Sequence, residues 1–70
     1  MDLQRVENLF RRYKGQTVSI KTLSGGAYEG IVSEITSDYV ALMTQSGDEN
    51  QYQVVVLLHS IESILPRNHT

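Results

Sequence analysis

The side chains in this sequence that can do chemistry are few, and the clearest group is a cluster of cations near its start. Four of the six basic residues lie before Gly15, namely Arg5, Arg11, Arg12 and Lys14. Such a cluster can contact phosphate groups. It can equally be a solvated helix face whose positive charge complements the carboxyl end of the helix dipole. The net charge of −2 argues weakly against a dedicated nucleic-acid binder.

Patterns typical of catalysis and of metal binding are absent from the sequence. It contains no cysteine and only two histidines, His59 and His69, so no cluster has zinc-ligand spacing. No pair of carboxylates or nucleophile–base pair stands out, and the adjacency of His59 and Ser60 along the chain says nothing about geometry. The Ser-Gly-Gly-Ala stretch at 24–27 joins two predicted strands, unlike a phosphate-binding loop. We therefore predict a protein that is not an enzyme and has no cofactor or metal.

The length of the chain favours self-association. Seventy residues make one domain, and a domain of this size buries only about 60% of the surface that its unfolded chain exposes. Without disulfides or a metal, contacts between subunits are the remaining source of stability. No apolar run reaches the length that spans a bilayer, and the N-terminus does not resemble a signal peptide. We expect a cytoplasmic protein with no membrane partner.

Apolar spacing predicts one helix followed by five strands. Residues 2–13 carry an apolar stripe at spacings of three and four, formed by Leu3, Val6, Leu9, Phe10 and Tyr13. The period then changes to two, with strands expected over 17–23, 27–35, 39–45, 52–58 and 60–65. Gly30 permits a bulge or sharp bend where the alternation slips, and Pro66 ends the last strand. The sequence thus predicts a single mainly β domain over 1–70: a helix at about 2–13, a small bent five-stranded antiparallel barrel at about 17–65, and a tail at 67–70.

The fourth predicted strand is apolar on both faces. Its residues in order are Val54, Val55, Val56, Leu57 and Leu58. A strand at the surface of a monomer should alternate, and an apolar exposed edge would invite aggregation. One face can fill the barrel, and we expect the other to contact a neighbouring subunit by strand addition along the edge. The alternative is a fully buried central strand in a monomer.

The order of these elements and a pair of glycines resemble the Sm-like (LSm) family, whose fold is a small SH3-like barrel. The matching residues in the first half are Val18, Ile20, Gly25, Tyr28, Gly30, Val32, Ile35 and the 39–43 strand. The stretch from Val56 to Pro66, with its His-x-Ile…Pro ending, is similar to the bacterial RNA chaperone (Hfq) branch. The Arg-Arg-Tyr-Lys run at 11–14 resembles the basic patch of that branch.

The resemblance implies a homo-oligomeric ring, a hexamer or heptamer, joined edge to edge by the fourth and fifth strands. It also implies single-stranded RNA as the ligand, bound by stacking and by hydrogen bonds to base edges. Tyr39 and His59 would lie at the pore, with Arg11, Arg12 and Lys14 forming a basic rim. Each also has a structural explanation: Tyr39 as a half-buried strand residue, and His59 as a partner for a backbone group. Tyr28 and Tyr52 fit packing better than ligand contact.

The sequence departs from the family at positions that read RNA. Thr36 and Val40 stand where Sm proteins usually carry Asp and Asn, and Leu57-Leu58 replaces an Arg-Gly pair. Leu58 also replaces the Lys that precedes the His in the chaperone branch. Because charge contacts to phosphate dominate nucleic-acid affinity, these changes support a second hypothesis. In it, the protein is an oligomeric structural or protein-adaptor ring that no longer binds RNA.

Overall fold

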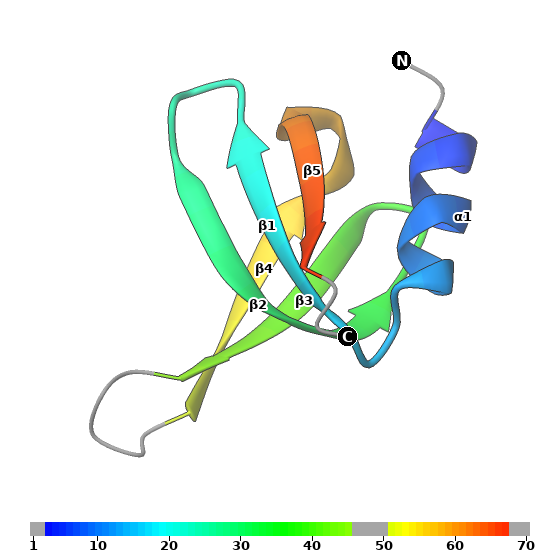
Figure 1. The fold of residues 1–70 in the computed structure, drawn as a ribbon. Coiled ribbons are helices and arrows are strands. Elements are labelled where there is room, and N and C mark those ends of the chain that lie inside the picture. The colour runs from blue at the N-terminus through cyan, green and yellow to red at the C-terminus, as the bar shows by residue number, and fades with distance from the viewer. Residues whose placement is uncertain (1–2, 46–50, 68–70) are drawn as a thin grey trace.

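A computed structural model describes residues 3–45 and 51–67 as one helix followed by a five-stranded sheet. In chain order the elements are α1 (Leu3–Arg12), β1 (Thr17–Thr22), β2 (Ala27–Ile35), β3 (Tyr39–Gln45), β4 (Gln51–Leu57), the 3-10 turn η1 (Leu58–Ser60) and β5 (Ile61–Arg67). All neighbouring strands are antiparallel, in the order β4-β3-β2-β1-β5 (Figure 1). The predicted mainly β fold with an N-terminal helix is confirmed. The bent sheet is not closed into a barrel, so β4 and β5 are its two edges.

Helix α1 is held to the sheet by part of the apolar stripe that the sequence predicts, since Leu3 is exposed and Leu9 lies outside the core cluster. Val6 and Phe10, one turn apart, are buried and belong to the core. The helix ends at Arg12, where the Tyr13 N–H donates to the Phe10 carbonyl at 3.0 Å, and Gly15 follows with a φ of 84°. The predicted bounds of 2–13 thus extend one residue further at each end. No helix within the described residues is long and apolar enough to cross a membrane.

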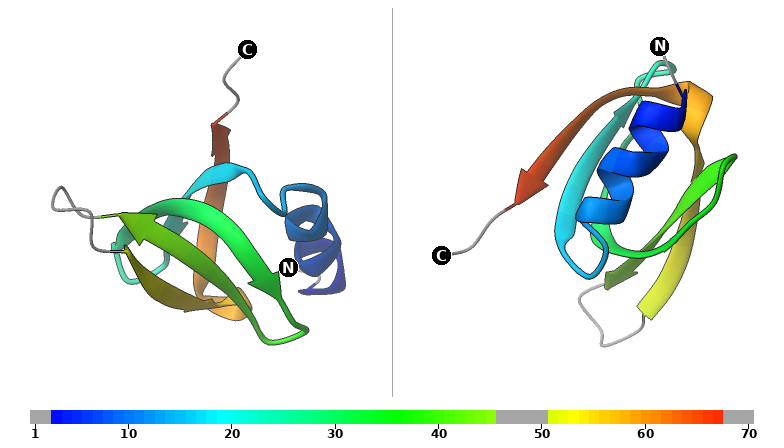
Figure 2. Two further views of the ribbon diagram at one scale, coloured as in Figure 1. Left: turned by 90° about the horizontal axis from the view of Figure 1, so that it is seen from below. Right: turned by 90° about the vertical axis from the view of Figure 1, so that its right-hand side faces the viewer.

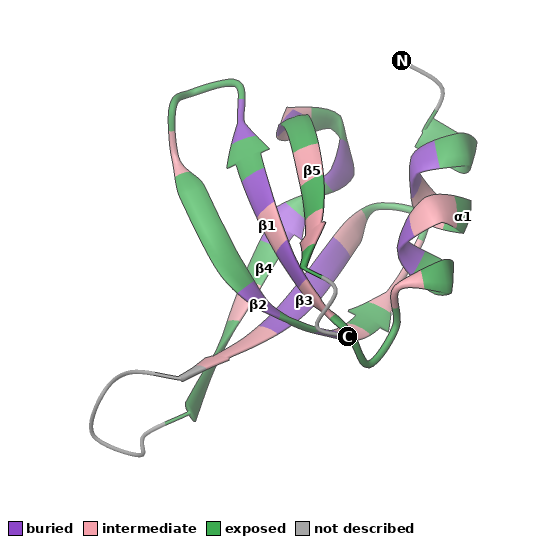
Figure 3. Cartoon of the chain, in the orientation of Figure 1, coloured by how far each residue is buried: buried purple, intermediate pink, exposed green. Residues whose placement is uncertain are grey.

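The core lies between the inner face of the bent sheet and the helix (Figures 2 and 3). Its buried members come from α1, all five strands and η1: Val6, Phe10, Val18, Ile20, Val32, Val40, Leu42, Val56, Leu58 and Ile61. β1 and β3 contribute alternate residues, as expected for a sheet with one covered face. The alternation is interrupted in β2 and β5, where the register shifts. Because helix and sheet share this single cluster, they form one folding unit.

Gly30 lets β2 and β3 approach closely where the sheet bends. A Cβ atom at this position would lie 2.7 Å from the Met43 carbonyl oxygen and 2.9 Å from Cγ2 of Thr44. The pairing stays regular at Gly30, opposite Val18, and the register shifts later, between Val32 and Glu34. The predicted slip at Gly30 is therefore displaced along the strand. The glycine serves close packing, and the bulge reverses the faces that the following residues occupy.

The last strand runs through Pro66, contrary to the prediction that this residue ends it. Pro66 pairs with Val18, and Arg67 pairs with Thr17. A proline is tolerated here because β5 is an edge strand, where one side of the backbone needs no ladder partner. The Nε of Arg67 also donates to Oε2 of Glu29 at 2.8 Å. Arg67 is thus in the strand, while residues 68–70 of the predicted tail and the predicted 46–50 loop lie outside the described residues.

Candidate functional site

Strand β4 is an edge strand with a buried face and an exposed apolar face. Val56 is buried, and Val54 is partly buried against the core. Val55 and Leu57 point to the other face, where they are 53% and 48% exposed. The topology therefore excludes the alternative in which β4 is a central strand. An aliphatic face on a strand whose outer backbone edge has no ladder partner is a site for strand addition.

The opposite edge of the sheet, β5, also exposes aliphatic surface. Leu65 is 63% exposed, while Ile64 packs against the core. Beyond its pairing with β1, no described strand pairs with β5. The chain thus carries two different open edges, each with exposed aliphatic side chains beside an unpaired backbone.

The structure narrows the predicted subunit interface on β4. Leu58 is fully buried and lies in η1, where its N–H donates to the Asp38 carbonyl at 2.9 Å. The side chain of Val56 is likewise in the core. Neither side chain is exposed to a neighbouring chain, so the exposed side chains left for that role are those of Val55 and Leu57, with Val54 only partly exposed. Leu58 stands where the chaperone branch carries a Lys before the His. Because this position is in the core, a charged side chain would not fit there.

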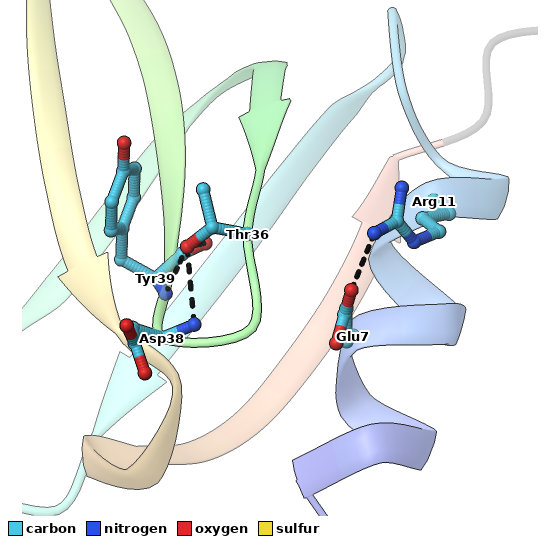
Figure 4. Close-up of polar contacts among 5 residues, drawn as sticks. All are labelled: Glu7, Arg11, Thr36, Asp38 and Tyr39. Carbon is cyan, nitrogen blue, oxygen red and sulfur yellow. Dashed lines mark hydrogen bonds and ion pairs between the residues drawn. The ribbon is translucent and has the colours of Figure 1, made fainter.

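The β2–β3 turn is built by Thr36, which in the sequence alone is only a departure from the Sm-like motif. Its Oγ1 accepts hydrogen bonds from the N–H of Asp38 at 3.1 Å and of Tyr39 at 3.0 Å (Figure 4). Its own N–H donates to the Tyr39 carbonyl at 2.9 Å. Thr36 therefore caps this turn and fixes where β3 begins. The sequence signal that could have indicated this role is a threonine three residues before the predicted start of a strand.

Tyr39 begins β3 on the outer face of the sheet. It is half-buried and pairs with Leu57 across the β3–β4 ladder. Val40, the next residue, points inward and is fully buried, so it cannot contact a ligand. Tyr39 can offer part of its ring to a ligand, and its half-buried position opposite Leu57 also fits the structural explanation of this residue.

His59 is exposed and lines a pocket of about 430 Å³ beside the start of α1. The other lining residues are Leu3, Leu23, Ile61 and Glu62. Tyr39 is not among them, so within one chain the two predicted pore residues do not share this pocket. In the described part of the chain, no three His, Asp or Glu side chains gather as metal ligands.

The cations at the end of α1 divide into two kinds. Arg11 forms an ion pair with Glu7, one helical turn earlier (Figure 4). Arg12 and Lys14 are exposed and form no ion pair with the described residues. The predicted basic rim is thus reduced, because one of its three cations is already neutralised by an acid whose spacing was readable in the sequence.

Replacing Thr36 with Ala should destabilise the protein by about 1 kcal/mol, because two backbone donors in the turn lose their acceptor. Thermal unfolding followed by circular dichroism measures this, with Ser37→Ala, an exposed neighbour in the same turn, as the control. Equal melting temperatures for the two variants would show that Thr36 does not hold the turn.

No protein-family model matches the chain, and no curated protein sequence is significantly similar to it. The likeness to the Sm-like family therefore rests on the residues named above and on the order of the elements.

Proposed function

We propose that this protein is the subunit of a homo-oligomeric Sm-like ring, hexameric or heptameric, in which β4 of one subunit pairs with β5 of the next. The observation that carries the proposal is the pair of open sheet edges, β4 and β5, each with exposed aliphatic residues. Contact between two different surfaces repeats head to tail, and a closed ring leaves no edge unpaired. The ring would also add buried apolar surface to a 70-residue chain whose own core is small.

We propose further that the ring binds single-stranded RNA. Arg12 and Lys14 are exposed and form no ion pair with the described residues, so they can follow the phosphate backbone along the rim. Tyr39 supplies part of an aromatic face for stacking. His59 supplies hydrogen-bonding nitrogens from η1, which lies beside the β2–β3 turn because the Leu58 N–H donates to the Asp38 carbonyl.

A protein-adaptor ring is the second candidate, and the surroundings of His59 favour it. Leu3, Leu23 and Ile61 surround the imidazole with aliphatic walls, and Glu62 places a carboxylate among them. A carboxylate repels phosphate, and the position before His59 is a buried leucine with no charge. These contacts suit a protein ligand better than a nucleic acid.

RNA binding should depend more on Arg12 and Lys14 than on Arg11. The double variant Arg12→Ala/Lys14→Ala is expected to weaken binding of a U-rich or A-rich single strand at least about tenfold and to lower the salt slope by about 2 for each subunit that the strand contacts. Arg11→Ala should have a smaller effect, because Glu7 already neutralises that charge. Fluorescence anisotropy titrations at several salt concentrations measure both quantities.

Lys21→Ala is the control for loss of a cation elsewhere, since Lys21 is exposed on β1. If the unmodified protein binds neither oligonucleotide at low salt, RNA binding is wrong and the adaptor function takes its place. A preparation that copurifies with nucleic acid would count against the adaptor function.

A further inference from the structure

We propose that the pocket around His59 is a socket for an apolar side chain of a partner protein, in a linear segment that carries Lys or Arg beside that side chain. The inference rests on the protein-adaptor function proposed above and names the chemistry of its partner. It concerns a site formed within one chain, so it does not require the ring.

Three segments that are far apart in the sequence form the walls of the socket. The start of α1 contributes Leu3, the residue after β1 contributes Leu23, and the start of β5 contributes Ile61. Figure 2 (right) shows the ribbon of α1 in front of the sheet. Ile61 is a buried floor, whereas Leu23 is 68% exposed, more than any other large apolar side chain in the described part of the chain. Covering these walls with an aliphatic group removes apolar surface from water.

The walls are held in place before any ligand arrives. The Leu23 N–H donates to the Ser60 carbonyl at 2.8 Å, which ties the end of β1 to η1. The Ile61 N–H bonds to the Leu58 carbonyl and closes the 3-10 turn, and Leu58 is itself anchored in the core. A preformed socket binds at a lower entropic cost than one that must be ordered by its ligand.

The pocket is large enough for an aliphatic side chain and is open to solvent. The volume of about 430 Å³ falls in the usual range for ligand pockets, about 300–1,000 Å³. Leu3 and Leu23 stand at the surface, so the pocket is reached from solvent. An aliphatic side chain can therefore enter while the backbone of its segment stays outside.

The carboxylate of Glu62 at the pocket determines which residue of the partner is favoured beside the apolar side chain that enters the socket. Glu62 is exposed and forms no ion pair with the described residues. Its carboxylate attracts a Lys or Arg of the partner and repels an acidic peptide or a phosphodiester. The charge thus favours a basic, apolar peptide over RNA at this position.

Amide NMR titrations with three short capped peptides test the socket. The Lys peptide is Gly-Lys-Leu-Lys-Gly. The Glu peptide has Glu in place of both Lys residues, and the Ser peptide has Ser in place of Leu. We expect the first to shift the signals of Leu23, His59, Ile61 and Glu62 and to bind two- to fivefold more tightly than the Glu peptide, an effect of about the size of an exposed ion pair. The Ser peptide should not bind. Leu23→Ser should weaken binding about tenfold.

Glu62→Gln should remove the preference for the Lys peptide, and Ile31→Ser, an exposed aliphatic residue on β2, should change nothing. Three outcomes would each overturn the inference. The Lys and Glu peptides could bind equally, the shifts could be confined to other residues, or a U-rich oligonucleotide could shift the same four signals. Sedimentation of the same samples reports assembly. A folded, assembled ring that ignores the peptides would refute the socket and leave the ring intact.

Discussion

Replacing Val55 or Leu57 with Asp should separate the assembly into folded monomers. Both side chains are about half exposed in the single chain, at 53% and 48%, so the monomer tolerates a charge there. At a subunit contact the same carboxylate would lose its water without gaining a partner, which costs on the order of 3 kcal/mol per interface. Each contact would weaken about a hundredfold. Sedimentation velocity measures the loss of the ring, and circular dichroism shows that the fold remains.

Two further variants give this experiment its controls. Ile31→Asp places the same charge on β2, at a residue that is 46% exposed and two strands away from the β4 edge, and the ring should persist. Val56→Asp buries the charge in the core and should unfold the chain. If the unmodified protein sediments as a monomer at micromolar concentration, or if neither Val55→Asp nor Leu57→Asp affects assembly, the β4 interface is wrong.

Gly30→Ala should lower the melting temperature by roughly 10 °C. The new Cβ would lie 2.7 Å from the Met43 carbonyl oxygen, which is backbone, and 2.9 Å from Cγ2 of Thr44. Forcing the two strands apart is an overpacking defect that costs about 1–3 kcal/mol, and each kcal/mol lowers the midpoint of a domain this small by about 4–8 °C. Thermal unfolding measured by circular dichroism reports the shift.

Glu34→Ala, at an exposed position of the same strand, is the control and should change the midpoint little. Adding Thr44→Ala to Gly30→Ala should not restore stability, because the closer contact is with the backbone. Full rescue by the double variant would show that the side chain of Thr44, and not the spacing of β2 and β3, sets the limit.

Much of the fold was predictable because it depends on neighbours along the chain. The spacing of Val6 and Phe10 defines a helix with one apolar face, and alternation of apolar residues defines strands. These signals placed the helix and the five strands, with bounds within about two residues of the observed ones, but not the 3-10 turn η1. The acid–base pair of Glu7 and Arg11, with i, i+4 spacing, was readable in the same way but was missed.

The candidate sites depended on pairing between distant segments. Five consecutive apolar residues at 54–58 can belong to an edge strand or to a central one. Only the strand order made β4 an edge, left Val55 and Leu57 exposed, and sent Leu58 into the core. Thr36 likewise matched no expected ligand type, and its role emerged only with the turn that it holds.

By itself, the sequence determined a helix followed by five short antiparallel strands, a glycine inside the second strand, and a surplus of apolar residues on the fourth strand. The tertiary structure decided which apolar residues remain outside, which cations form no ion pair with the described residues, and that Leu3, Leu23 and Ile61 meet around His59. The physical reason is the distance along the chain over which each kind of interaction acts. Periodicity and turn chemistry act over a few residues, whereas strand order and the walls of a pocket are set by contacts between segments that the linear pattern does not relate.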